Sequence, residues 1–181
     1  KQGAVPVLAV YSTFLQRSYD MLLHDVAIEG LHVVLGVDRA GLVGEDGETH
    51  HGVFDVAYLD SIPGMTVLAP SSYAELERML KQAVLERKGP VAVRYPRGGE
   101  GSYTGDAGDS PAAVLRKGTD ITLAGYGVEI NEILLAAELL EQQGVQAEVV
   151  KLNLLTPLDP ELVVRSVRHT GAMLVAEDCV E

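Results

Sequence analysis

Short apolar runs alternate with segments of helical periodicity along the whole chain. The runs predict strands at residues 5–10, 33–37, 66–69, 91–95, 121–124, 147–152 and 172–176. Between them, apolar residues recur at helical spacing, in the sets Leu15, Tyr19, Leu22 and Val26; Leu76, Met79, Leu80 and Ala83; and Ile133, Leu134, Ala137 and Leu140. Parallel strands need crossover connections, which are usually helices. The alternation therefore predicts an α/β fold whose parallel sheets are covered by helices on both faces.

The composition changes between residues 98 and 118, where glycines are frequent and apolar periodicity is lost. Such a stretch is typical of a linker. The sequence therefore predicts two consecutive parallel-sheet α/β domains, the first at residues 1–98 and the second at 118–181, joined by a linker at 99–117. The second domain has few strands for a doubly wound fold, so we expect it to be truncated.

Three local motifs mark where helices begin. Thr13 with Gln16 three residues later is a possible capping box, and Asp159-Pro160 is typical of a helix start. Gly125-Tyr126-Gly127 lies between a predicted strand and a predicted helix. Ile130 occupies the place of the third glycine of a dinucleotide-binding fingerprint, so a plain strand-to-helix turn is expected there.

The loop at residues 38–52 follows a predicted buried strand and combines four glycines with ionisable side chains. Loops at the carboxyl ends of parallel strands are where α/β proteins build their sites. This loop is also longer than the roughly six residues that such connections commonly use. A glycine-rich surface loop whose polar residues cap one another is the plainer interpretation. A metal site of Asp46, His50 and His51 is a weaker alternative, because adjacent side chains seldom converge on one ion.

The formal net charge of −12 argues against nucleic acid or an anionic membrane as a partner, since both need a basic surface. A phosphorylated substrate would need a local cluster of cations on such an acidic protein. Arg17, Arg39 and Arg97 each lie at or near the end of a predicted strand, where such a cluster can form.

The single cysteine, Cys179, cannot form an intrachain disulfide, which indicates a reducing cytoplasm. No apolar run reaches the roughly 18 residues of a membrane span, and no basic-then-apolar leader is expected. Glu177 and Asp178 next to Cys179 are expected to raise its pKa, so we do not nominate it as a nucleophile.

Several motifs together carry a resemblance to a known family. They are Tyr11-Ser12-Thr13-Phe14-Leu15-Gln16-Arg17, Asp38-Arg39-Ala40-Gly41-Leu42-Val43-Gly44, Asp46-Gly47, Thr49-His50 and Arg94-Tyr95-Pro96-Arg97-Gly98. On these motifs the chain resembles the 1-deoxy-D-xylulose-5-phosphate synthases, which are transketolase-like, thiamine-diphosphate-dependent transferases. The resemblance implies a homodimeric enzyme that condenses pyruvate with glyceraldehyde 3-phosphate and releases carbon dioxide. Its product feeds the synthesis of isoprenoid precursors, thiamine and pyridoxal.

The resemblance also implies roles for single residues. Tyr11 and Phe14 are expected to bind the cofactor, with Phe14 stacked on its aminopyrimidine ring. His50 and Asp46 are expected to be catalytic, and the residues expected to bind substrate are Arg17, Arg39, Arg97 and Asp46. Two departures from the family pattern are Glu48, where proline is usual, and His51, where glutamine is frequent. The added carboxylate of Glu48 is expected to weaken anion binding.

Other parts of the family pattern do not occur in these 181 residues. They include the Gly-Asp-Gly…Asn motif for the cofactor's diphosphate and magnesium, and the glutamate that activates the aminopyrimidine. We therefore expect thiamine diphosphate as cofactor, with magnesium bound by an amino-terminal domain outside this chain, and no activity from this piece alone. The alternatives are a transketolase-like paralogue, the beta subunit of a 2-oxo acid dehydrogenase, or a non-catalytic dimerisation module. Arg39 within Asp-Arg-Ala-Gly favours the synthase over the first two.

Overall fold

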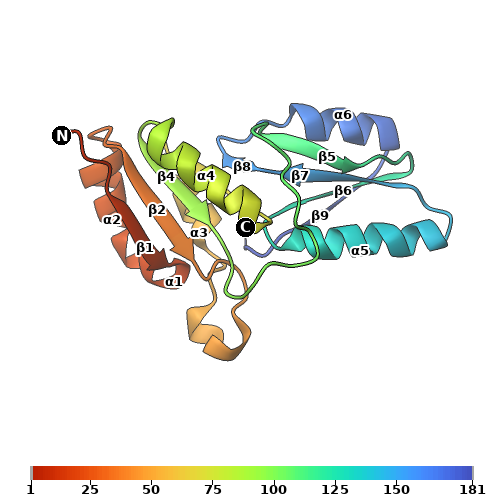
Figure 1. Ribbon diagram of the computed structural model, residues 1–181, viewed down its shortest axis with the longest axis horizontal. Helices are drawn as coiled ribbons and strands as arrows, with labels where there is room; N and C mark the ends of the chain where they lie inside the picture. Colours follow the sequence, from red (N-terminus) through yellow and green to blue (C-terminus); the bar gives the residue numbers. More distant parts are fainter. Residues whose placement is uncertain (1, 181) are drawn as a thin grey trace.

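The structure is a computed structural model that describes residues 2–180, and it contains two α/β units arranged side by side (Figure 1). The first unit is a five-stranded sheet in the order β1-β2-β4-β3-β8. Its strands β1 (Val7–Tyr11), β2 (Val33–Asp38), β4 (Pro90–Arg94) and β3 (Thr66–Leu68) are parallel. The fifth strand, β8 (Leu154–Thr156), pairs antiparallel with β3. The predicted parallel α/β architecture is thus confirmed for this unit.

Helices cover both faces of the first sheet because successive strand residues point to opposite sides. Leu35 packs with Leu15 and Leu59, which belong to the helical segments α1 (Ser12–Leu15) and α3 (Asp55–Asp60). Its neighbour Val34 packs instead with Met79 of α4 (Tyr73–Leu85). Each face therefore has its own apolar core, and the stripe predicted on α4 is the side that packs on the sheet.

The helical segment after β1 is less regular than the sequence suggested. It runs from α1 through a 3-10 turn (Gln16–Ser18) and α2 (Tyr19–Met21) into π-helical turns (Leu22–Ala27). The predicted capping box is wrong, because the helix begins at Ser12 and the Thr13 hydroxyl donates to the carbonyl of Thr49 at 3.3 Å. Thr13 therefore uses its hydroxyl to contact the 38–52 loop. The predicted inward stripe is confirmed, since its four members all pack in the same core cluster.

The second unit is a four-stranded sheet in the order β5-β7-β6-β9. Strands β7 (Ala147–Leu152), β6 (Ile121–Tyr126) and β9 (Met173–Ala176) are parallel, and β5 (Ala112–Arg116) is antiparallel to β7. Helices α5 (Glu129–Gln142) and α6 (Glu161–Thr170) lie on opposite faces of this sheet (Figure 1). The start of α6 follows the predicted motif, because the Asp159 carboxylate accepts a hydrogen bond from the Glu161 N–H at 3.0 Å.

Two short strands depart from the sequence-based expectation. Strand β5 lies inside the range 99–117 that we expected to be a linker, so the second sheet begins before residue 118. Strand β8 follows β7 in the chain but joins the edge of the first sheet. The two units therefore share a strand connection as well as a linker. Across residues 2–180, no helix has both the length and the apolar character that crossing a bilayer requires.

Candidate functional site

The edge at which the parallel strands of the first sheet end carries most of the nominated residues. Tyr11 is the last residue of β1, Asp38 is the last of β2, and Arg97 follows β4. The loop between β2 and α3 projects from this edge (Figure 1). Since ligands of α/β sheets bind outside the carboxyl ends of the strands, this edge is the candidate site.

The base of the loop is closed by a pair of backbone hydrogen bonds between two glycines. The N–H of Gly41 donates to the carbonyl of Gly52 at 2.9 Å, and the N–H of Gly52 donates to the carbonyl of Gly41 at 2.8 Å. A Cβ at Gly52 would overlap the Arg39 carbonyl and lie 2.6 Å from the Ser12 hydroxyl. Glycine at 52 therefore allows the loop to close against the start of α1.

Arg39 is held between two carboxylates by its side chain and its backbone. Its Nε lies 2.7 Å from Asp46 Oδ2 and its Nη1 lies 2.8 Å from Asp38 Oδ2. Its φ of 59° is left-handed, which costs an L residue roughly 1–2 kcal/mol. The hydrogen bond from its own N–H to Asp38 Oδ1, at 2.7 Å, helps to hold this conformation. The guanidinium carbon also lies 3.8 Å from the centre of the Tyr11 ring.

Asp46 joins the two arginines that follow β2 and β4. Arg97 Nε lies 3.2 Å from the same Asp46 Oδ2 atom that Arg39 contacts, and Arg97 Nη2 lies 3.4 Å from Glu45 Oε2. The hydrogen bond from Arg39, followed by the charges of Arg97, Arg39 and His50, lowers the pKa of Asp46. The same bond raises the pKa of Arg39. Each guanidinium has five N–H donors, so both arginines keep donors for an incoming anion.

Three rings form a small aromatic surface beside this cluster. Tyr11 and Phe14 are stacked with centroids 5.3 Å apart and an interplanar angle of 13°. The His50 ring meets Phe14 edge-on, with centroids 5.5 Å apart. Phe14 remains 43% exposed, so its ring is accessible to a ligand. His50 Nδ1 lies 3.0 Å from the Thr49 hydroxyl, which leaves Nε2 as the nitrogen without a partner among residues 2–180.

The structure does not bring every nominated side chain together. Arg17 is exposed on the 3-10 turn after α1 and forms no ion pair with any residue in the described part of the chain. His51 accepts a hydrogen bond from the Val43 N–H through Nδ1 at 3.2 Å, so it supports the loop. Within residues 2–180, no group of three His, Cys, Asp or Glu side chains is placed to hold a metal ion, so the structure does not bring Asp46, His50 and His51 together as the metal alternative requires.

Two contributors were missed by the sequence reasoning. Asp38 pairs with Arg39, and Thr49 bonds His50 through its hydroxyl while its carbonyl accepts from Thr13. The adjacency of opposite charges in Asp38-Arg39 was a usable signal for the first. The second depends on the approach of α1 to the loop, which no local pattern reports. Glu48, expected as a disturbing charge, is exposed, and Glu45 is the carboxylate that reaches Arg97.

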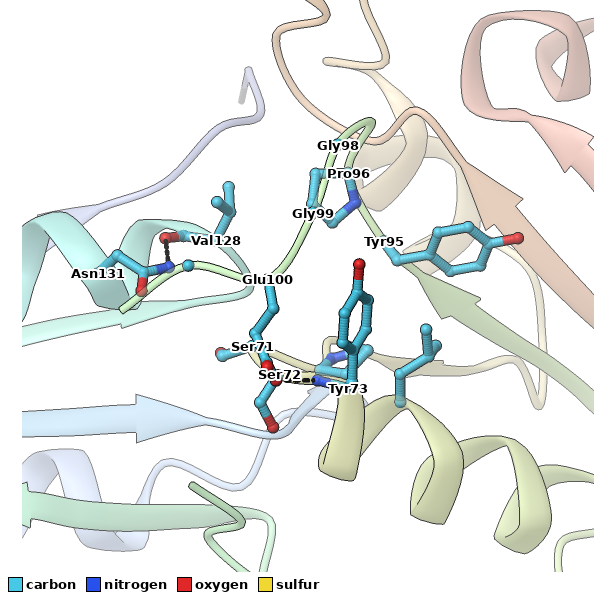
Figure 2. Close-up of a pocket in the computed structure, with 13 residues that line it drawn as sticks. Ser71, Ser72, Tyr73, Tyr95, Pro96, Gly98, Gly99, Glu100, Val128 and Asn131 are labelled. Atoms are coloured by element: carbon cyan, nitrogen blue, oxygen red, sulfur yellow. Dashed lines mark hydrogen bonds between the residues drawn. The ribbon is translucent and has the colours of Figure 1, made fainter. Parts of the chain in front are cut away.

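A separate pocket with a cavity volume of about 80 Å³ lies between the start of α4, the segment after β4 and the start of α5. Figure 2 shows its polar groups bonded to one another: the Tyr73 N–H donates to Glu100 at 2.7 Å, and Asn131 donates to the Val128 carbonyl at 2.9 Å. None of the nominated site residues lines it. The candidate site is therefore the open edge with Arg39 and Asp46, and this pocket is distinct from it.

Comparison with known families agrees with this architecture. The family described as transketolase, pyrimidine binding domain, matches residues 1–99. The chain belongs to the transketolase family. A second match, to the transketolase C-terminal domain, covers residues 110–181 of this transketolase-family chain. It begins before β5, in agreement with the start of the second sheet.

Relatives of this transketolase-family chain include proteins named 1-deoxy-D-xylulose-5-phosphate synthase. That of Gloeobacter violaceus is 48% identical over 97% of this chain, and that of Chlorobaculum tepidum is 46% identical over 98%. The chain spans only 28% and 29% of these two relatives. A solved structure described as "Split gene transketolase, inactive beta4 tetramer" matches with a TM-score of 0.87 and 31% identity, over 98% of this chain and 58% of that one. The resemblance indicated by the motifs is thus confirmed.

Proposed function

We propose that this chain is part of a 1-deoxy-D-xylulose-5-phosphate synthase, which joins pyruvate to glyceraldehyde 3-phosphate with loss of carbon dioxide. One observation carries the proposal: two arginines share the Asp46 carboxylate directly beside an exposed aromatic surface. An anionic acceptor and a flat cofactor ring need these two features side by side. The similarity to named synthases supports the same assignment.

The residues present fit the ring end of thiamine diphosphate. Phe14 is stacked on Tyr11 and remains exposed, so it offers the aromatic face that an aminopyrimidine needs. When bound, this cofactor supplies a nucleophilic carbon that adds to carbonyl groups. We propose that its diphosphate and Mg²⁺ are held by residues outside this chain, because the described residues offer no cluster for a metal ion.

Arg39 and Arg97 are proposed to bind the phosphate or carboxylate of the substrates. A guanidinium matches either anion with two parallel hydrogen bonds, and both arginines keep unused donors. Asp46 holds the two guanidinium groups at a fixed spacing and is proposed to accept a hydrogen bond from an acceptor hydroxyl. The substrate-binding role of Arg17 stays a prediction. Its side chain is exposed three residues after Phe14, and it does not contact the carboxylates that pair with Arg39 and Arg97.

His50 is proposed to move a proton at the acceptor's oxygen. Its Nδ1 is engaged by the Thr49 hydroxyl, so Nε2 is the atom that can donate to or accept from a ligand. The edge-on contact with Phe14 places the imidazole beside the proposed ring site. A proton donor at this position stabilises charge that develops on the oxygen as the new carbon–carbon bond forms.

We further propose that residues 1–181 alone are inactive and self-associate, in a cytoplasmic location that suits the single cysteine. Apolar side chains are exposed on two edge strands, on β1 at Val7 and Leu8 and on β9 at Leu174 and Val175. Such surfaces commonly mark protein contacts. The matching solved structure is described as an inactive beta4 tetramer, which supports both expectations.

A chimera tests the proposed activity. This chain replaces the matching segment of the Gloeobacter violaceus synthase, and formation of 1-deoxy-D-xylulose 5-phosphate from pyruvate and glyceraldehyde 3-phosphate is measured. The chimera should turn over both substrates. Arg97→Ala should raise KM for glyceraldehyde 3-phosphate, because a charge remote from the reacting carbon is bound in the ground state and the transition state alike. The expected loss of roughly 1.5–3 kcal/mol corresponds to about ten- to a hundredfold in kcat/KM.

His50→Ala should lower kcat more than it raises KM, because its contribution grows as charge develops. The matched control is Arg116→Ala. It removes a guanidinium that lies 2.8 Å from Glu141 in the second unit, away from the candidate site on the first sheet. The control should have the same kcat and KM as the unmodified chimera. An Arg97→Ala chimera with unchanged kcat and KM would show that the anion-binding role is wrong.

A further inference from the structure

Arg94, the last residue of β4, is fully buried and contacts both units of the chain. Its Nε lies 3.1 Å from Asp55 Oδ2, where Asp55 is the first residue of α3. Its Nη1 lies 2.9 Å from Asp178 Oδ1, in the segment that follows β9 of the second sheet. Arg94 is therefore the shared cation of two carboxylates that come from different units.

Asp178 lies directly against the base of the site loop. Gly41 has a φ of +76°, and a Cβ at this position would overlap the Asp178 carboxylate. Two residues later, the N–H of Val180 donates to the carbonyl of Val53 at 2.8 Å. Gly41 is also one of the two glycines whose backbone hydrogen bonds close the loop. The segment 178–180 thus contacts Gly41 near the start of the loop and Val53 directly after its last residue.

The surroundings of Arg94 account for the burial of its charge. Besides the contacts with the two carboxylates, Arg94 Nη2 lies 3.2 Å from the Cys179 sulfur, and the Cys179 thiol donates to Asp55 at 3.1 Å. Burial, with a smaller contribution from the Asp55 charge, raises the pKa of Cys179 to about 12, so the thiol is neutral. The direction matches the sequence-based expectation, although burial is its main cause. Without Arg94, two buried carboxylates would face each other with no cation between them.

We propose that Arg94 and Asp178 form an interdomain clamp that fixes the base of the 38–52 loop, so that the second unit positions Asp46 and His50. This segment contacts the first unit at Gly41 within the loop, at Val53 and Asp55 just after it, and at Arg94 at the end of β4. The consequence for catalysis rests on the proposed function. The mechanical part of the clamp does not, and it is measured without substrate.

Hydrogen exchange on the 181-residue chain tests the clamp. Asp178→Asn keeps the shape of the side chain and removes the charge that faces Arg94. The Gly41 and Gly52 amides should then exchange at least about tenfold faster, while amides of β2 keep their rates. The matched control is Asp106→Asn, the same substitution in a carboxylate that lies 2.9 Å from Arg78 and touches no part of the loop. It should leave the loop amides unchanged.

A second pair of variants keeps the test decisive if Asp178→Asn does not fold. Val180→Pro removes the N–H that donates to Val53, and Val180→Ala retains it. Only the proline variant should loosen the loop amides. Loop exchange at the wild-type rate in folded Asp178→Asn or Val180→Pro would overturn the clamp, and so would an equal increase in Asp106→Asn.

Kinetics of the chimera then separate a positioning role from a structural one. Arg94→Met should lower kcat/KM for glyceraldehyde 3-phosphate at least about tenfold at temperatures where the protein remains folded, and Arg94→Lys should restore part of it. Wild-type kcat/KM in folded Arg94→Met would overturn the positioning role. A chimera that is inactive with the wild-type sequence would count against the proposed function, whereas the exchange result would still decide the clamp.

Discussion

Replacing Lys151 by methionine removes a buried ammonium and leaves a carboxylate in the interior. Lys151 lies on β7 of the second sheet, and its Nζ is 3.0 Å from Glu75 on α4 of the first unit; both side chains are fully buried. Lys151 also donates to the Asn153 side chain. Burial lowers the pKa of Lys151, and the Glu75 charge opposes that shift. The ammonium therefore stays charged chiefly because Glu75 is present.

The expected loss of stability depends on the hydrogen bonds that Glu75 still accepts after the substitution. After the substitution its carboxylate still accepts hydrogen bonds from the N–H of Ser71 at 2.7 Å, from the N–H of Ala107 at 3.0 Å and from the Tyr103 hydroxyl at 3.2 Å. Breaking a buried pair usually costs about 3–5 kcal/mol, and the three remaining donors place this case near the lower end, at about 3 kcal/mol. For a chain of this length, each kcal/mol lowers Tm by roughly 2–4 °C, so Tm should fall by roughly 6–12 °C.

Thermal and urea unfolding, followed by circular dichroism, measure this loss. The control is Lys81→Met, which breaks an exposed pair with Glu77 on the same helix as Glu75 and should change stability by less than about 0.5 kcal/mol. Adding Glu75→Gln to Lys151→Met should recover part of the loss, because no buried charge then remains. A Lys151→Met chain as stable as Lys81→Met would refute the reasoning.

The pKa of Asp46 is lowered, chiefly by its hydrogen bond from Arg39. Its carboxylate therefore stabilises the folded chain at pH values above the ordinary pKa of about 4. This contribution is lost as the pH falls through the lower pKa of the folded chain. Thermal unfolding of wild type and Asp46→Asn should therefore differ at neutral pH and converge in acid; a gap that widens in acid would contradict the pairing. Burial raises the pKa of Cys179 to about 12, so iodoacetamide at mildly alkaline pH should label it only as fast as the chain opens; labelling at the rate of a free thiol in the folded chain would disagree. In the chimera, Phe14→Ala should raise the thiamine diphosphate concentration needed for half-maximal activity, whereas Phe54→Ala, which removes the other exposed phenylalanine, should not; equal effects would argue against a stacking role.

Much of the fold could be read from local patterns. Residues 33–37 form a strand because an apolar run of that length is buried on both faces, and Val34 and Leu35 do pack in separate cores. The stripe on α5 likewise packs in a single cluster. The glycine-rich loop could also be located from the sequence, because it directly follows the apolar run that forms β2.

The short antiparallel strands could not be predicted in the same way. Strand β5 follows a glycine-rich segment and β8 has three residues, so neither produces a clear period. These segments form strands because each pairs with a strand at the edge of a sheet. Strand β5 pairs with β7, and β8 pairs with β3 of the other unit. Edge pairing of this kind depends on how the units meet, which local propensity does not report.

The candidate site, like the fold, could be predicted only in part from the sequence. The sequence by itself indicated that Tyr11, Arg39 and Arg97 stand at the sheet edge, because each follows a predicted strand. Only the tertiary structure decided that Arg39 and Arg97 share one carboxylate oxygen, that Arg17 stands apart, and that Arg94 joins Asp55 to Asp178. The physical reason is that sequence patterns report only interactions between residues close together in the chain. Periodicity reports which face of an element is buried, whereas an ion pair between distant segments forms only where packing brings both charges out of water together.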